Sequence, residues 1–130
     1  MRLVGNGSLN RYPCTSPHPA ACNSQKPYRP VSEAKLASND AAVREAETKR
    51  AWQGEPSGAH PQCESAYGVH DLTGNVEEWV QTSRPEWAYR SSLKGGYWSK
   101  PWAGCRGTND SHGPQFRFYE VGLRCCREPG

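Results

Sequence analysis

Glycine and proline interrupt this chain so often that long regular elements are excluded from most of its length. The 130 residues include 13 glycines and 11 prolines, only 35% are hydrophobic, and long apolar periodic segments are missing. Because both residues disfavour helix and strand interiors, the sequence predicts a loop-rich, irregular α+β fold in a single domain, 1–130. We expect the five Trp and six Tyr to form its core, since each aromatic ring buries a large surface.

One segment, 32–53, is expected to be helical. It is rich in helix formers, Ser38 or Asn39 can cap its start, and Gly54 follows as a stop. Its apolar face is thin, so we expect an inserted surface helix that is anchored by Trp52. Two short strand-like pieces follow further along the chain, at residues 92–98 and 119–126.

The charge pattern excludes several functional classes. The net charge is only +3, and basic residues are mixed with acidic ones instead of forming a stripe, so no nucleic-acid partner is expected. No run of eighteen apolar residues is present, and no transmembrane segment is therefore expected. The apolar run at the N-terminus, Leu3 and Val4, is too short for the core of a signal peptide.

Six cysteines are many for a chain of this length. They favour an oxidising, extracytoplasmic compartment and disulfide bonds, although their connectivity stays open. Their spacing fits no CxxC zinc pattern. The six are Cys14, Cys22, Cys63, Cys105, Cys125 and Cys126.

The stretch YGVHDLTGNVEEW, residues 67–79, combines carboxylates with a glycine turn. Calcium binds six to eight oxygens, and short loops supply them as carboxylates and backbone carbonyls. Here the side chains of Asp71 and Glu78 can converge while the carbonyls of Gly74 and Val76 point between them. The alternative is a turn without an ion, in which polar side chains cap local amides.

Four motifs in order carry a resemblance to a known family. YGVHDLTGNVEEWV, LKGGYW, CRG and VGLRCC resemble the signature of the formylglycine-generating enzyme (sulfatase-modifying factor) family, which reads roughly GLYDMxGNVWEW, RGGSW, CRSAxR and GFR. An upstream stretch, RYPCTSPHPAACN, is similar to the YPWG…AN segment of the family. Because family domains normally begin further upstream, the chain looks like the C-terminal portion of such a domain.

The resemblance implies a fold and two calcium sites. The family has a C-type-lectin-related fold and carries calcium on its GNxWEW loop, which places the ligands on the four groups proposed above. A second family site would use the side chain of Asn23 and the carbonyl of Ser24.

The resemblance also implies an oxidation chemistry that requires a pair of cysteines. Formylglycine generators oxidise a substrate cysteine with O₂ at a copper ion held by two cysteines after the GGSW motif, and Cu(I) requires such thiolates. Counting forward from Gly96, the first cysteine falls on Lys100 and the second on Cys105. Counting backward from Gly122, Cys105 aligns with a structural segment instead. Either count breaks the pair.

Two functions are consistent with these residues. The first is a non-catalytic, calcium-stabilised module that binds a ligand or partner through its C-terminal loops. The alternative is a formylglycine-generating oxidoreductase in which Cys105 binds copper together with Cys63 or Cys126. The residues expected to form the binding loops are Trp98, Trp102, Asn109, Asp110 and Arg117.

The remaining histidines are not expected to bind metal. His60 and His112 are interpreted as solvated or packing residues, and His70 as a packing or hydrogen-bonding residue.

Overall fold

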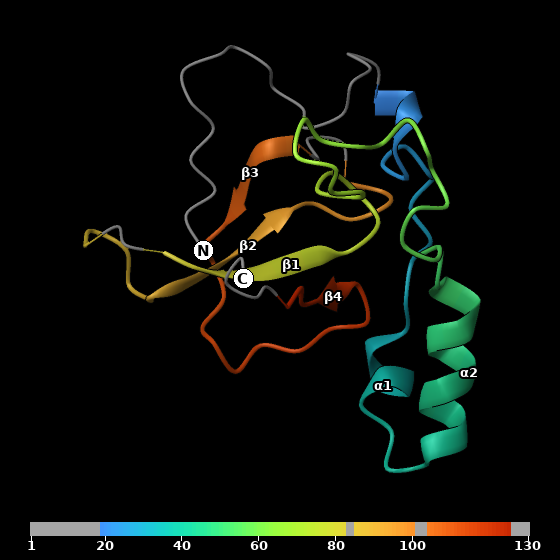
Figure 1. The fold of residues 1–130 in the computed structure, drawn as a ribbon. Helices are drawn as coiled ribbons and strands as arrows, with labels where there is room; N and C mark the ends of the chain where they lie inside the picture. The colour runs from blue at the N-terminus through green and yellow to red at the C-terminus, as the bar shows by residue number, and fades with distance from the viewer. Residues whose placement is uncertain (1–18, 83–84, 101–103, 126–130) are drawn as a thin grey trace.

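A four-stranded mixed sheet forms the centre of the molecule (Figure 1). The computed structural model describes residues 19–82, 85–100 and 104–125. The strands are β1 Glu77–Gln81, β2 Ser91–Gly95, β3 Gly104–Asn109 and β4 Val121–Gly122. They lie in the order β3-β2-β1-β4, with β2 antiparallel to both neighbours and β4 parallel to β1. A sheet with a few short helices is compatible with the expected α+β class.

The helical segment contains two α-helices instead of one. They are α1 Glu33–Leu36 and α2 Ala41–Ala51, and a 3-10 turn, Pro19–Ala21, precedes them. The expected cap at Ser38 or Asn39 is wrong. Asp40 caps α2, because its carboxylate accepts a hydrogen bond from the Ala42 amide at 2.8 Å.

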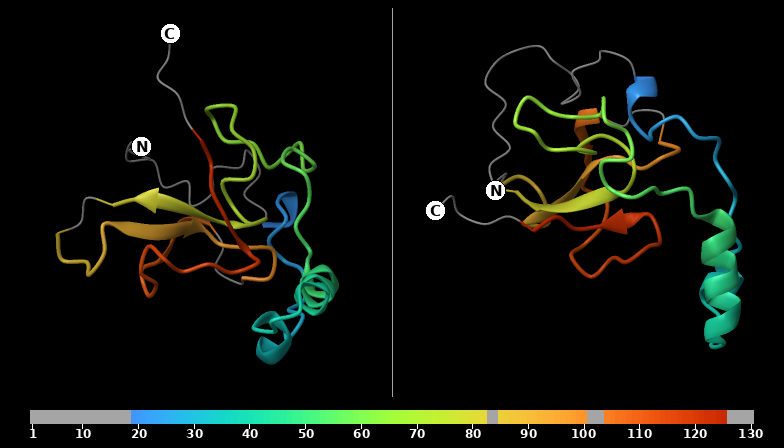
Figure 2. Two further views of the ribbon diagram at one scale, coloured as in Figure 1. Left: turned by 90° about the horizontal axis from the view of Figure 1, so that it is seen from below. Right: turned by 45° about the vertical axis from the view of Figure 1, so that its right-hand side comes forward.

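Glu47 joins the two helices. Its carboxylate accepts the Ser32 amide at 2.8 Å, just before α1, and pairs with Arg50 on its own helix at 2.6 Å. These contacts lower the pKa of Glu47 to about 2, Arg50 contributing most. Figures 1 and 2 show α1 and α2 side by side at one edge of the molecule, away from the strands. Most of α2 is exposed, so the expected surface helix is confirmed.

The core is small and unusually polar. Leu93 and Trp98 are its largest apolar side chains, and Asn23, Thr73 and Ser92 are buried as completely. The aromatic core expected from the sequence is confirmed in part, because Trp98 is buried and contacts the rings of Tyr97 and Tyr119. Several aromatic side chains are substantially exposed, namely Tyr28, Trp52, Tyr67 and Tyr89.

Trp52 nevertheless anchors the helical segment. Its ring meets that of Trp98 edge to face, with the ring centroids 4.8 Å apart. Such aromatic pairs contribute about 0.5–1.5 kcal/mol beyond the area that they bury. The C-terminal end of α2 is thereby fixed to the core.

A buried disulfide, Cys22–Cys63, closes a loop that contains both α-helices. Its two cysteines are 41 positions apart in the sequence. Cross-linking a chain over such a span removes conformational entropy from the unfolded state. The pairing ties the segment before α1 to the turn that precedes Asp71.

Among the described residues, none of the helices is both long and apolar enough to cross a membrane.

Candidate functional site

The loop between Asp71 and β1 has a left-handed backbone at three positions. Asp71, Gly74 and Asn75 have φ angles of 58°, 74° and 62°. A Cβ atom at Gly74 would lie 2.3 Å from the carbonyl oxygen of Asn23. Glycine is therefore required at position 74 for two reasons, its φ angle and the close approach of another backbone segment.

Asn75 connects this loop to two distant segments. Its side chain accepts the Glu55 amide at 2.9 Å and donates to the Glu55 carbonyl at 3.0 Å, while its own amide donates to the Asn23 carbonyl at 2.7 Å. Asn23 in turn donates from Nδ2 to Gln53 at 3.0 Å. Asn23 Oδ1 is buried and has no hydrogen-bond partner within the described residues. This oxygen is the one feature of Asn23 that suits a cation.

Asp71 is buried and directed toward the turn at 57–58. Its Oδ2 accepts the Gly58 amide at 2.7 Å and the Ser57 hydroxyl at 3.2 Å. Both hydrogen bonds that Asp71 accepts from the described part of the chain end on this one oxygen.

Glu78 has a different partner. Its two carboxylate oxygens face Arg124, with Nε to Oε2 at 3.0 Å and the second guanidinium contact to Oε1 at 2.6 Å. Arg124 also donates to the carbonyl of His70 at 3.0 Å. The guanidinium therefore bridges the first strand and the residue that precedes Asp71.

The donor types in this loop suit a hard cation. Carboxylate and carbonyl oxygens are the ligands that calcium prefers, and the four predicted groups are Asp71, Gly74, Val76 and Glu78. Within 19–82, 85–100 and 104–125, however, no group of three or more His, Cys, Asp or Glu side chains is arranged to hold a metal. Calcium binding at the loop and at Asn23 stays a prediction.

Lys100, on which the forward count places the first copper ligand, is mostly buried and paired with a carboxylate. Its ammonium lies against Glu77, whose side chain is 6% exposed. The other Glu77 oxygen accepts a hydrogen bond from Asn109 at 3.4 Å. Lys100 also lies over the Tyr97 ring, 5.6 Å from its centroid. These contacts give Lys100 a structural role in this structure.

The comparison with family models decides the family. Residues 7–129 match the model described as the sulfatase-modifying factor enzyme 1-like domain. The chain belongs to this family. Searches of curated proteins and of solved structures found no match.

A second carboxylate lies close to the Lys100–Glu77 pair. Burial and the nearby charge of Glu77 raise the pKa of Glu120 to about 7. The Tyr119 hydroxyl hydrogen-bonds this carboxylate, and burial raises the pKa of Tyr119 strongly. Burial also raises the pKa of Tyr97 to about 12. In this sulfatase-modifying factor-like domain, a polar network therefore surrounds Lys100, the residue that the forward count aligns with the first copper ligand.

Of the three candidate thiolates, only that of Cys63 lies within the described part of the chain. Cys105 lies on β3, and its side chain is outside the described part of the chain. Cys126 falls outside the described residues altogether. Cys63 cannot serve as the second copper ligand as it stands, because its sulfur is bonded to that of Cys22. This correction removes one of the two alternatives for a copper pair.

The predicted binding loops divide into inward and outward residues. Asn109 is directed toward Glu77, whereas Asp110 and Arg117 are exposed. Trp98 is core, and Trp102 lies outside the described residues. Among the described members of this predicted set, Asp110 and Arg117 are therefore the ones with exposed side chains.

The three described histidines have ordinary packing partners. His112 is not simply solvated, because it stacks on Phe116 with the ring centroids 3.7 Å apart. His60 lies 2.9 Å from Glu55, and Nδ1 of His70 is buried without a hydrogen-bond partner among the described residues.

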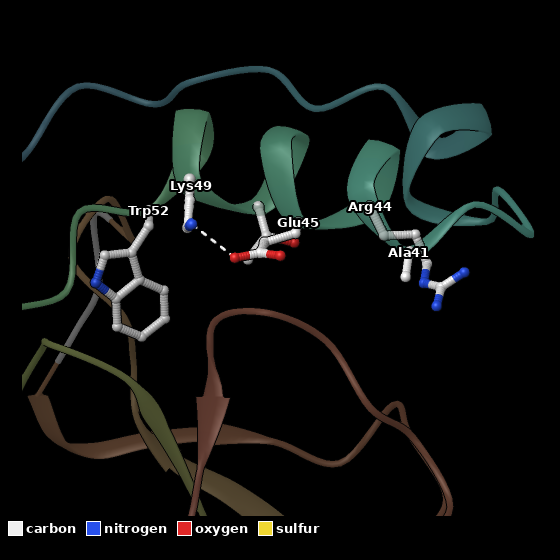
Figure 3. A pocket seen from close by; sticks show the side chains of 6 residues that line it. Ala41, Arg44, Glu45, Lys49 and Trp52 are labelled. Atoms are coloured by element: carbon white, nitrogen blue, oxygen red, sulfur yellow. Dashed lines mark ion pairs between the residues drawn. The ribbon is translucent and has the colours of Figure 1, made fainter.

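A separate open recess lies along α2 (Figure 3). Its volume is about 550 Å³. It is lined by Ala41, Arg44, Glu45, Thr48, Lys49 and Trp52. Glu45 and Lys49 form an exposed ion pair across it at 2.6 Å. None of the predicted site residues lines this recess.

Proposed function

We propose that this chain is a non-catalytic member of the sulfatase-modifying factor family that acts by binding a ligand or partner. The observation that carries the proposal is the burial of Lys100 against Glu77 at a copper-ligand position. A lysine ammonium has no lone pair to offer a metal, and Cu(I) requires soft thiolates. The arrangement supports a binding module more than a copper oxidase.

Binding of Cu(I) tests this proposal. Titration of the protein, with the Cys22–Cys63 disulfide intact, should reveal no tight stoichiometric site. Lys100→Cys provides a matched gain of a thiolate, and Lys100→Ala controls for loss of the ammonium. A stoichiometric site in the unaltered protein that disappears in Cys105→Ser would contradict the proposal and favour the oxidoreductase.

The proposal includes calcium and a C-type-lectin-related fold as finer features. Support for calcium comes from the oxygen donors of the Asp71–Glu78 loop and from the unpaired, buried Oδ1 of Asn23. When bound, the ion would stiffen the loop and would take no part in chemistry. The loop-rich architecture around a small mixed sheet supports the fold assignment.

The proposed partner surface lies on the loops after β3. Asp110 and Arg117 are exposed there, and both can exchange water for a partner's polar groups at little cost in stability. Because no internal hydrogen bond of the fold is described for either side chain, both are suited to recognition.

A further inference from the structure

Glu78 and Asp71 differ in how much of each carboxylate is available to a cation. Both hydrogen bonds to Asp71 end on Oδ2. By contrast, both oxygens of Glu78 are used by the Arg124 fork, at 2.6 and 3.0 Å. A two-point contact of this kind places the guanidinium against both oxygens of the carboxylate. An ion at this loop would have to compete with Arg124 for Glu78.

Arg124 reaches Glu78 from a lightly held segment. β4, which precedes Arg124, joins β1 through only two residue pairs, Glu77–Val121 and Glu78–Gly122. Leu123 is 74% exposed. The guanidinium also donates to the carbonyl of His70, so one side chain joins β1, the loop and residues 123–125, the described segment after β4. Loss of this contact would loosen the segment after β4.

The ion pair is accessible enough to exchange. The side chains of Arg124 and Glu78 are 27% and 16% exposed. Ion pairs that solvent reaches contribute modestly to stability, so a divalent cation can offer Glu78 a comparable alternative. A cation bound at Glu78 and the positively charged guanidinium of Arg124 would also repel one another, because both would lie against the same carboxylate.

We infer that Arg124 is an internal competitor for the cation at Glu78, so that calcium binding releases Arg124 and loosens the segment after β4. This inference rests on the proposed calcium site. A ligand shifts an equilibrium between two states only by its preference for one of them. Here the preferred state is the one in which Glu78 has exchanged its guanidinium for the ion.

Calcium affinity of the full chain, measured by isothermal titration calorimetry, tests the competition. Arg124→Gln should bind Ca²⁺ about tenfold more tightly than the unaltered protein, which is within the usual range of coupling between sites. Glu78→Gln should bind more weakly than either. Equal or weaker binding by Arg124→Gln, with measurable binding by the unaltered protein, would overturn the competition and leave the calcium site standing.

A second measurement uses the unaltered protein and so does not depend on whether a substituted protein folds. In ¹H–¹⁵N spectra of the unaltered protein, the Arg124 Nε–H resonance should move on addition of Ca²⁺, together with the amides of Asp71 and Gly74. Movement of these amides with an unchanged Arg124 signal would overturn the inference alone. No change anywhere in the spectrum would remove the calcium site and the inference with it.

Discussion

Three residues of the loop at 71–75 have a left-handed backbone, and each has a different reason to tolerate it. Asp71 adopts its left-handed backbone while accepting two hydrogen bonds, and Asn75 does so while bonding the backbone of Glu55. Asn and Asp tolerate this region better than other side chains. At Gly74 the absence of a side chain itself matters, because it lets the Asn23 carbonyl approach the backbone.

Gly74→Ala should therefore destabilise the fold more than an alanine at a glycine that has only a positive φ. Gly68 offers the control, because its φ is 71° but a Cβ there would meet nothing closer than 3.5 Å. We expect Gly68→Ala to cost about 1 kcal/mol and Gly74→Ala about 3 kcal/mol or more. Urea denaturation measures both. Equal losses would show that the contact with Asn23 does not matter.

Glu120 predicts a pH dependence of stability. Burial raises the pKa of Glu120 in the folded protein from its ordinary value of 4.5 to about 7. The stabilising contribution of its protonated form is thus fully present below about pH 4.5 and is lost as the pH rises through about 7. Glu120→Gln should stay uncharged and be more stable than the unaltered protein at pH 8, by about 1 kcal/mol after allowance for solvent screening.

Denaturation between pH 4 and pH 8 measures this effect, and exposed Glu86→Gln serves as the control. If the stability of Glu120→Gln and that of the unaltered protein changed with pH in parallel, the raised pKa of Glu120 would be contradicted.

At the scale of elements, helix-forming and alternating apolar patterns are visible in the sequence. A strand whose carboxylates form ion pairs with distant residues carries no such pattern. The helical region and the strand at 121–122 fall within predicted segments, and the strand at 91–95 overlaps the predicted segment 92–98, although β4 is far shorter than expected. β1 was missed because Glu77 and Glu78 read as loop carboxylates. Their partners, Lys100 and Arg124, are remote in sequence.

In the candidate site, too, local features could be predicted from the sequence, whereas contacts between distant residues could not. The sequence predicts a glycine turn in 67–79, and the positive φ of Gly74 agrees with it. The pairing of Glu78 with Arg124 could not be foreseen, because no local pattern relates residues 46 positions apart. The same holds for Asn75, whose side chain fixes the loop to the distant Glu55.

The Cys22–Cys63 disulfide should contribute most of the stability of the helical segment. It closes a span of 41 positions around α1 and α2. Replacing both cysteines by serine should lower the free energy of unfolding by about 2–5 kcal/mol. Chemical denaturation measures the loss. Cys125→Ser is the control, since this thiol is exposed and unbonded, and a comparable loss in that variant would contradict the prediction.

At the scale of the whole molecule, a small polar core leaves the fold dependent on cross-links. The proposed calcium ion would be one of them, because an ion that binds only the native state stabilises it by mass action. Excess EDTA should therefore lower the melting temperature of the unaltered protein by several degrees. In Asp71→Ala the difference should vanish. An unchanged melting curve with EDTA would count against calcium.

The central claim of the proposed function is that this member of the sulfatase-modifying factor family does not carry out copper-dependent oxidation. Lys100, which the forward count aligns with the first copper ligand, forms a buried pair with Glu77. Conversion of a substrate cysteine to formylglycine would require Cu(I) bound at two sulfurs.

Incubation of the protein with Cu(I), O₂ and cysteine-containing peptides, followed by an aldehyde-reactive probe and mass spectrometry, tests this claim most directly. We predict no aldehyde above the level produced by copper alone, and the same result for Cys105→Ser. Aldehyde formation by the unaltered protein that Cys105→Ser abolishes would contradict it.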